Sequence, residues 1–555
     1  MNKTETSGQS NTMYLTKSNY RSWLRCPKRL WMDKYRRGER LSIEKSPWIE
    51  IGKIVEKNAK ELFGDMNPEI PRSDISNAAR AQMTKKYIDA GTEFIYEAAF
   101  IGDDNSDKKP FCSVDILRIN KGKLEIIEVK GKTDKDKKVM KRTGELRLGI
   151  DSIDMHDMAY QYHVVTNAGL SVNDVSIMRL NSNYRFQNEL DLNELFTEDS
   201  CIEQVLELQG EITANITNMR DILSPPDTEP DIIIGGNKCD KCGYFHLCWS
   251  PSKVPRPNAF EIGFGKPDRG ISQDKKMIAF IENLSFTEIY DRRDELGLNS
   301  AQRKQVKTLA DPSIDHNKLI EKDKLRDFLD GLEYPVYHLD FETYNIPIPM
   351  YNGDPPNLTQ VPFQYSLHVQ FKEGEFRREK IDHIEFLAEG GTDPRKELAV
   401  HMFNAFKRYN LKKGTILTYN MSFERSIILK LAERFENSPD VPEGMCDFFR
   451  KITDKETGWI VDLMIPFGKG HYYHSKMGKS YSLKVIVQAL LGYDPYAKLT
   501  GVTNGGDALE TFPILSDIKD PEELRKKRQE LLDYCYLDTW VMVEILEKLT
   551  EITRE

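Results

Sequence analysis

Two kinds of hydrophobic pattern alternate along this chain, and together they predict a mixed α/β protein. Short runs rich in Val, Ile, Tyr and Phe predict strands, whereas apolar residues spaced three and four apart predict amphipathic helices. The predicted strands cover residues 96–100, 112–133 (a β-hairpin), 336–343, 414–420 and 459–463. The predicted helices cover a segment from Met13 through Lys28, then 48–63, 156–166, 482–491 and 530–549, with polar helices over 187–222.

The length of 555 residues predicts two or three domains. Residues 1–12 are polar and predict a disordered tail, and residues 13–250 predict a first domain. Prolines followed by charged helical patterns predict a linker and helical connector over 251–332. A second α/β domain is expected over 333–555.

The hairpin of 112–133 carries the first candidate site. If its turn centres on Lys121-Gly122, Asp115 lies opposite Glu128, and cross-strand partners are about 5 Å apart. Lys130 then shares the face of Glu128, while Val114, Ile116, Ile127 and Val129 point to the other side. Facing carboxylates are tolerable with a divalent cation between them, and their oxygens suit Mg²⁺ or Mn²⁺. The lysine is expected to stabilise charge on a phosphate.

A cysteine cluster ends the first domain. Cys239, Cys242 and Cys248 have the spacing of metal ligands, because a two-residue gap lets two thiolates reach one centre. The fourth ligand is either the distant Cys26 or the local His246, and the spacing suits zinc and iron–sulfur clusters equally.

The Asp…Glu-x-Lys order resembles the core of the PD-(D/E)XK nucleases. With the Cys-Pro-Lys-Arg segment at 26–29, the helical Gln161 and the terminal cysteines, residues 13–250 resemble RecB-like nucleases associated with CRISPR systems. The resemblance implies a [4Fe-4S] cluster on Cys26, Cys239, Cys242 and Cys248. Two positions depart from that family: Glu56 stands where a histidine metal ligand is usual, and no tyrosine follows Gln161 at the usual spacing. Glu56 can still bind a hard cation, and Glu97 is a further candidate ligand.

The second domain carries a second set of acids. Asp340 and Glu342 are two apart in a strand and share a face, which is costly beside apolar neighbours unless a metal binds them. Glu424 falls in the first turn of the helix that follows the strand at 414–420. Tyr534 and Asp538 are four apart on a helix and share its face.

These three motifs, in this order, resemble the DnaQ-like (DEDD) 3′–5′ exonucleases, which have a ribonuclease-H-like fold. The resemblance implies that Asp340, Glu342, Glu424 and Asp538 hold two Mg²⁺ or Mn²⁺ ions about 4 Å apart, while Tyr534 orients the attacking water. Glu424 replaces the usual aspartate, and Asp462 is a spare acid nearby. The whole chain also resembles an uncharacterised bacterial family that fuses the two nuclease-like halves.

Composition limits the cellular setting. No apolar run approaches the roughly 18 residues of a membrane span, and the N-terminus lacks a signal-peptide core, which predicts a cytoplasmic protein without a membrane partner. The net charge is −9, so a nucleic-acid partner needs local basic patches. Residues 17–40 carry nine Lys and Arg against two acids, which fits either a nucleic-acid surface or a solvated helix face. His471 and His474 lie in a basic loop with the same two interpretations.

Together, these features predict a metal-dependent nuclease acting on nucleic acid, DNA rather than RNA. The predicted catalytic residues are Asp340, Glu342, Glu424, Tyr534 and Asp538 in the second domain and Asp115, Glu128 and Lys130 in the first. The main alternative is a nucleic-acid-binding adaptor with a degenerate first domain and a structural metal cluster. A small-molecule phosphoesterase is a third possibility, which would not need the second domain.

Overall fold

The computed structural model describes residues 13–42, 48–102, 106–134, 150–224, 226–230, 242–248, 284–311, 318–409, 414–478 and 480–555, with positions 139–140, 146–147, 239, 262 and 313. The expected tail over 1–12 and most of the expected linker after 250 lie outside these residues. The chain forms two compact units. The first unit is Met1–Ser250 with Ile346–Leu358, and the second is Pro251–Asn345 with Thr359–Glu555.

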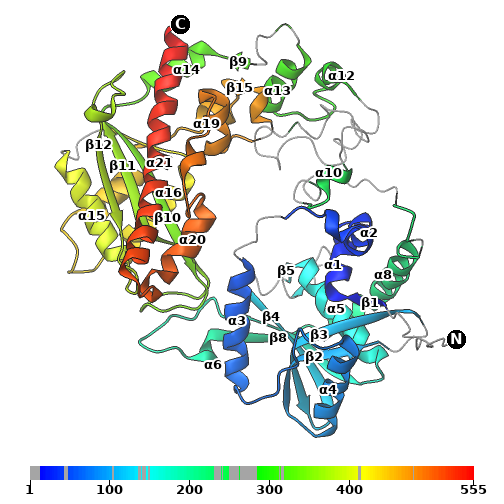
Figure 1. Ribbon diagram of the computed structural model, residues 1–555. Coiled ribbons are helices and arrows are strands. Elements are labelled where there is room, and N and C mark those ends of the chain that lie inside the picture. Colours follow the sequence, from blue (N-terminus) through cyan, green and yellow to red (C-terminus); the bar gives the residue numbers. More distant parts are fainter. Residues whose placement is uncertain are drawn as a thin grey trace, which may run out of the picture. The chain divides into compact units, whose positions relative to one another are not determined.

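A six-stranded sheet forms the centre of the first unit (Figure 1). Its strands are β1 (Met13–Thr16), β2 (Phe94–Ile101), β3 (Lys108–Asn120), β4 (Lys123–Thr133), β7 (Val172–Leu180) and β8 (Phe196–Ser200). The order is β1-β3-β4-β7-β8, and β2 also pairs with β3. β1 runs parallel to β3 and β4 parallel to β7, whereas the β2–β3, β3–β4 and β7–β8 pairs are antiparallel.

The hairpin turn is confirmed at Lys121-Gly122. Both residues have positive φ angles, 51° and 77°, and Asn120 pairs with Lys123, as in a two-residue hairpin turn. The paired register runs to Ile116 opposite Ile127. The prediction for Val114 is wrong, because Val114 packs in a different apolar cluster from Ile116, Ile127 and Val129. The regular ladder does not extend to Val114, and the neighbouring strand is distorted at Glu97, whose φ is 55°.

Helices cover both faces of this sheet. One face packs on α3 through Val55 and Ala59, and the other packs on α1, α5 and α8. The bounds are α1 (Lys17–Arg25), α2 (Pro27–Tyr35), α3 (Trp48–Phe63), α4 (Asn77–Asp89), α5 (Ser152–Asn167), α6 (Leu192–Leu195), α7 (Ile202–Glu207), α8 (Gln209–Ile222) and α10 (Phe245–Cys248).

Two predicted helices of the first unit are interrupted. The segment from Met13 begins as β1, and its helix stops at Cys26, which is extended (φ −166°, ψ 118°). Pro27 then starts α2, because proline suits the first helical position and disfavours helix at the residue before it. The region 187–222 is not all helical, since β8 adds an edge strand to the sheet.

The second unit is built on a five-stranded sheet with the order β12-β11-β10-β13-β14. Its strands are β10 (Val336–Ile346), β11 (Leu358–Gln370), β12 (Asp382–Leu387), β13 (Thr415–Thr418) and β14 (Ile460–Asp462). β10, β13 and β14 are mutually parallel, whereas β12 is antiparallel to β11. The α/β class predicted from the hydrophobic pattern is therefore confirmed in both units.

Helices also flank this second sheet. The side chains of Leu339 and Phe341 point into a core formed with α15, α16 and α17. α21 contacts β11 by other residues: Gln364 donates to the Leu531 carbonyl (2.8 Å), and Ser366 bonds Thr539 (2.6 Å). The bounds are α15 (Arg395–Arg408), α16 (Ser422–Arg434), α17 (Met445–Thr453), α19 (Leu483–Leu491), α20 (Gly505–Ile514) and α21 (Pro521–Arg554).

Part of the predicted connector is helical and belongs to the second unit. It contains α12 (Phe286–Asp291), α13 (Ser300–Ala310), β9 (Lys318–Ile320) and α14 (Lys322–Asp330). β9 pairs with β15 (Tyr472–His474), the strand inside the basic loop. His471 bonds Glu321 (2.7 Å) and His474 is buried, so both histidines already have protein partners. Among the helices that the structure describes, none combines the length and hydrophobicity needed to cross a membrane.

Candidate metal centres

Three carboxylates of the second unit meet at one point. Asp340 and Glu342 project from the same face of β10, as the strand period predicts, and α21 brings Asp538 to them. One oxygen from each of the three lies within 4.8 Å of the others. Glu342 and Asp538 are buried at 7% exposure, and Asp340 is partly exposed. Among the residues that the structure describes, no other group of three or more potential metal ligands comes within this distance.

The electrostatics of this group favour a cation. Burial raises the pKa of Asp340 well above its usual value, and the charge of Asp538 raises it further. The pKa of Glu342 is raised by burial and then by Asp340 and Asp538. Burial raises the pKa of Asp538 to about 6, against the opposing effect of hydrogen bonds from Tyr496 and Tyr534. Protons or metal ions must therefore offset the repulsion among the three.

Tyr534 lies beside Asp538, as expected from their spacing on α21. The tyrosine is 6% exposed, and its pKa is raised by burial and by the neighbouring charge of Asp538. The hydroxyl of Tyr496 also donates to Asp538 at 2.5 Å. Tyr496 was not predicted, because it lies in a short 3-10 helix, Pro495–Lys498, that joins the site only through the folding of the second unit.

Lys484 is a second unpredicted member of this site. Its ammonium nitrogen lies over the rings of Tyr496 (4.9 Å) and Tyr534 (5.6 Å) and donates to the Thr503 carbonyl at 2.6 Å. Its charge lowers the pKa of Glu342 and Asp538, although burial has the larger, opposite effect. The only sequence signal was a basic residue at the start of the helix 483–491, which is too common to single out.

Glu424 is placed in the first turn of α16 but stands outside the three-carboxylate group. It is 1% exposed, and its Oε2 atom has no hydrogen-bond partner within the described residues. Burial and then the charge of Asp340 raise its pKa well above the usual value. Such an orphaned buried oxygen next to Asp340 fits a ligand to an additional cation. Asp462, in contrast, caps the backbone by accepting from the N–H groups of Asn420 (3.0 Å) and Met464 (2.9 Å).

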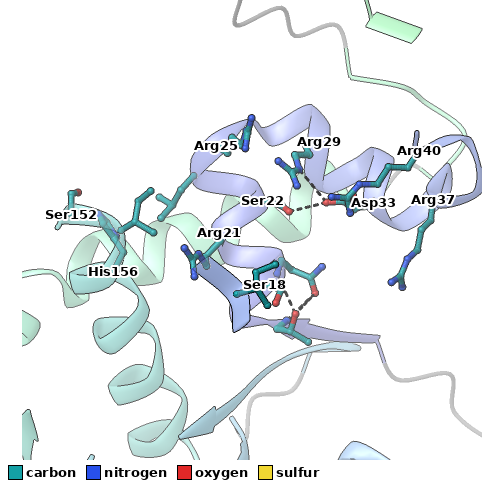
Figure 2. Close-up of a pocket in the computed structure, with 15 residues that line it drawn as sticks. Ser18, Arg21, Ser22, Arg25, Arg29, Asp33, Arg37, Arg40, Ser152 and His156 are labelled. Carbon is teal, nitrogen blue, oxygen red and sulfur yellow. Dashed lines mark hydrogen bonds and ion pairs between the residues drawn. The ribbon is translucent and has the colours of Figure 1, made fainter. Parts of the chain in front are cut away.

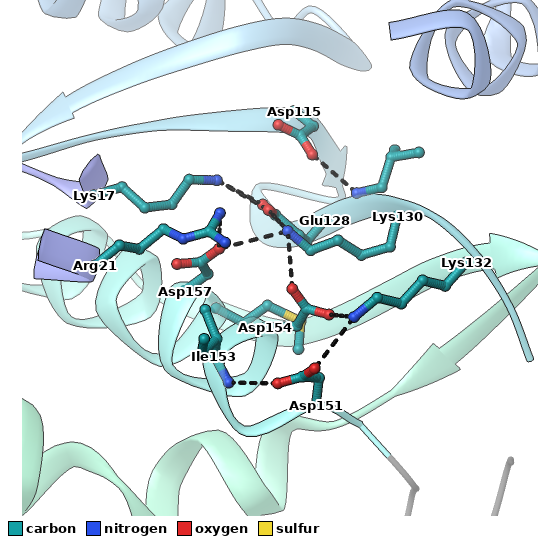
Figure 3. Close-up of polar contacts among 12 residues, drawn as sticks. Lys17, Arg21, Asp115, Glu128, Lys130, Lys132, Asp151, Ile153, Asp154 and Asp157 are labelled. Atoms are coloured by element: carbon teal, nitrogen blue, oxygen red, sulfur yellow. Dashed lines mark hydrogen bonds and ion pairs between the residues drawn. The ribbon is translucent and has the colours of Figure 1, made fainter. Parts of the chain in front are cut away.

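The candidate site of the first unit is a dense ion-pair network around Glu128 (Figure 3). Glu128 is 1% exposed and accepts hydrogen bonds from Lys17 (2.9 Å), Lys130 (2.7 Å) and Gln161 (2.5 Å). Burial alone would raise its pKa, but the charges of Lys130 and Lys17 lower it well below the usual range. Two lysines therefore already neutralise the predicted metal ligand.

Asp115 lies close to Glu128 but interacts with the backbone. Its Oδ2 atom accepts from the N–H of Val129 at 2.9 Å. Burial, and then the charge of Glu128, raise its pKa to about 7. Lys130 also faces Asp154 (3.6 Å) and Asp157 (3.5 Å) on α5, so its charge is shared among three acids.

Glu56 and Glu97, the two further candidate metal ligands of the first unit, form ion pairs with basic side chains. A single nitrogen of Arg72 contacts Glu56 at 2.6 Å and Glu97 at 2.5 Å. Lys60 contacts the same two carboxylates at 2.8 and 3.2 Å. Glu56 and Glu97 therefore share one network with Arg72 and Lys60, and the charge of Glu97 also raises the pKa of Asp115.

The predicted cysteine ligands include Cys26, which directly precedes α2, and Cys242 and Cys248, which pack against the apolar cluster of Trp31, Met32 and Tyr244. Burial raises the pKa of Cys26, against backbone N–H groups of Arg29 and Lys28, and the charge of Cys242 raises it further. Cys248 has its pKa raised to about 11 by burial, and Cys242, Cys239 and Cys26 all contribute to that rise. Among the described residues, no three of these cysteines bring their sulfur atoms within 4.8 Å of one another, so the structure shows no assembled four-thiolate site. The competing ligand His246 is exposed on α10.

The cysteine segment is anchored to α2 by a small apolar cluster. Tyr244, between Cys242 and Cys248, is 1% exposed and packs with Trp31 and Met32. Its hydroxyl donates to Asp33 at 3.0 Å, and the Leu41 N–H donates to the Gly243 carbonyl at 3.0 Å. These contacts hold residues about two hundred positions apart in sequence next to one another.

One family model matches part of the chain. Residues 337–482 match the model described as "Domain of unknown function (DUF2779)". This segment contains Asp340, Glu342 and Glu424 but ends before Tyr534 and Asp538. No curated protein matches the sequence.

Proposed function

We propose that this protein is a metal-dependent nuclease whose second unit is a 3′–5′ exonuclease acting on nucleic acid, DNA rather than RNA. The observation that carries the proposal is the convergence of Asp340, Glu342 and Asp538 within 4.8 Å, although α21 and β10 are far apart in sequence. The strand order β12-β11-β10-β13-β14, with parallel β10, β13 and β14, supports the ribonuclease-H-like resemblance.

The proposed mechanism assigns metal binding to the carboxylates. Asp340, Glu342 and Asp538, with Glu424 next to them, would hold Mg²⁺ or Mn²⁺, which supplies an activated water and stabilises the leaving oxygen. Tyr496 holds the Asp538 carboxylate in place through its hydrogen bond. Tyr534 is positioned beside Asp538 to orient the attacking water. Lys484 adds a positive charge next to the acids, which favours an anionic transition state.

For the first unit, we propose a nuclease-like domain whose four cysteines hold a [4Fe-4S] cluster or, alternatively, zinc. Asp115, Glu128 and Lys130 are its proposed catalytic residues, with Glu56 as a more distant metal ligand. One observation favours the second candidate function, a nucleic-acid-binding adaptor: Lys17 and Lys130 already neutralise Glu128. The first unit is therefore proposed as the weaker nuclease of the two.

A product-ladder assay tests the proposal. Single-stranded and duplex DNA and RNA labelled at the 5′ end are incubated with the full chain and Mn²⁺. The wild type should shorten DNA stepwise from its 3′ end, and Asp340→Asn should abolish the ladder. Asp533→Asn is the matched control, because Asp533 is an exposed acid on α21. If Asp340→Asn keeps full activity while Glu128→Gln loses it, the activity belongs to the first unit and the assignment is wrong.

A further inference from the structure

The first two helices and the turn that follows them, Arg37–Glu39, line a cavity of the first unit with arginines (Figure 2). Its volume is about 1180 Å³, and Arg21, Arg25, Arg29, Arg37 and Arg40 all line it. Asp33 is the one acid among its described lining residues. The basic stretch 17–40 is therefore folded so that five of its arginines surround one hollow, instead of being spread over a solvated helix face.

The acid that lines the cavity does not balance this charge. Asp33 is shared, since Arg29 and Arg40 each approach one of its oxygens at 3.6 Å. The same carboxylate also accepts hydrogen bonds from Ser22 (2.8 Å) and Tyr244 (3.0 Å). Arg37 is exposed. Arg21 is paired with Asp157 (3.3 Å), which leaves four guanidinium groups against the carboxylate of Asp33, and their field attracts an anion with several charges.

The opposite wall of the cavity is partly apolar and leads to the Glu128 network. Ile49 and Ile153 line it and are 53% and 46% exposed. Ile153 lies on α5 next to Asp154, which faces Lys130. Arg21 connects the cavity with the Glu128 network, because it lines the cavity and contacts Asp157 at 3.3 Å. A chain lying in the cavity would therefore reach the candidate site of the first unit.

We propose that this cavity binds the sugar–phosphate backbone of a single-stranded nucleic acid and leads it to Asp115 and Glu128. Arginine matches phosphate through paired hydrogen bonds, and the exposed isoleucines offer apolar surface to bases and sugars. The volume exceeds the roughly 300–1,000 Å³ of small-molecule pockets, which favours several nucleotides over one. The path of the nucleic acid to Asp115 and Glu128 rests on the proposed nuclease function. Binding of the nucleic acid in the cavity does not.

Fluorescence anisotropy of a labelled single-stranded oligonucleotide tests this proposal. The full chain is titrated without added divalent metal, so that binding is measured apart from cleavage. Arg37→Gln and the double variant Arg29→Gln/Arg37→Gln should weaken binding roughly three- to tenfold per arginine. Each lost phosphate contact should also reduce the slope of log K against log salt by about 0.7. Lys85→Gln is the control, since Lys85 is 76% exposed on α4 and does not line the cavity.

Three outcomes decide the matter. Unchanged affinity and salt slope in both arginine variants would overturn the proposal, and the exposed position of Arg37 makes a folding defect in the single variant easy to exclude by circular dichroism. Acidic lipid vesicles that bind the cavity in place of the oligonucleotide would overturn it as well. Arginine-dependent binding by a protein that cleaves nothing would uphold the cavity and refute the nuclease function, so the two failures are distinguishable.

Discussion

Asp538→Asn should stabilise the metal-free second unit while removing its response to metal. The substitution preserves the shape of the side chain and leaves an oxygen that can accept the hydrogen bond from Tyr496. It removes one of three negative charges that the fold holds within 4.8 Å. The gain should appear only where Asp538 is ionised in the wild type.

The size of the effect follows from the pKa of Asp538. Burial raises this pKa from 3.8 to about 6, and one pKa unit corresponds to about 1.4 kcal/mol. Ionisation of Asp538 at about pH 8 therefore lowers the free energy of unfolding by about 3 kcal/mol. Because the folded pKa is the higher one, this cost is absent below about pH 4 and complete above about pH 6. Bound Mn²⁺ at a hundred times its Kd would stabilise the wild type by about 2.7 kcal/mol.

Hydrogen–deuterium exchange of peptides from α21 measures this local stability. For a chain with two units, this method is better suited than one unfolding midpoint, because the two units need not unfold together. In metal-free protein at about pH 8, Asp538→Asn should exchange more slowly than the wild type, and Mn²⁺ should protect the wild type but not Asp538→Asn. The control Asp533→Asn should behave as the wild type in both conditions. Faster exchange of α21 in metal-free Asp538→Asn would show that the carboxylates do not repel one another, and the electrostatic argument would be wrong.

Two further predictions concern Lys484 and Cys26. Lys484→Met should raise the pKa of Glu342 and Asp538, so the acidic limb of the pH–activity profile should move to higher pH by up to about one unit. Lys484→Arg should restore the wild-type profile. An unmoved limb in Lys484→Met would show that this lysine does not act on the two acids. Cys26→Ser should lose the iron or zinc measured by mass spectrometry and make the first unit more sensitive to proteolysis, because the proposed site would join α2 to a segment about two hundred residues later. Retention of full metal in Cys26→Ser, with loss in His246→Ala, would point to the local histidine as the fourth ligand.

Local rules predicted those parts of the structure that depend on neighbouring residues. The turn at Lys121-Gly122 fixed the hairpin register, because a two-residue turn leaves one way to pair the strands. Strand and helix periods likewise placed Asp340 with Glu342, and Tyr534 with Asp538. The boundaries of the helix 48–63 also match the structure.

Residues that reach a site only through tertiary folding were not predicted. Lys17 contacts Glu128 across 111 positions of sequence, and no local pattern marks that pair. Lys484 and Tyr496 join the acids of the second unit in the same way. Val114 was misplaced because strict alternation assumes an undistorted ladder, and β2 is distorted at Glu97.

The hydrogen bond between the Val129 amide and Asp115 gives the first unit a built-in spectroscopic indicator. The chemical shift of an amide proton depends on the charge of its acceptor, so the Val129 resonance should follow the ionisation of Asp115, with a midpoint near the pKa of about 7. A cation that binds Asp115 competes with the proton and would move this midpoint to lower pH. One backbone nucleus can thus report whether metal enters this site, even where catalysis is too slow to follow.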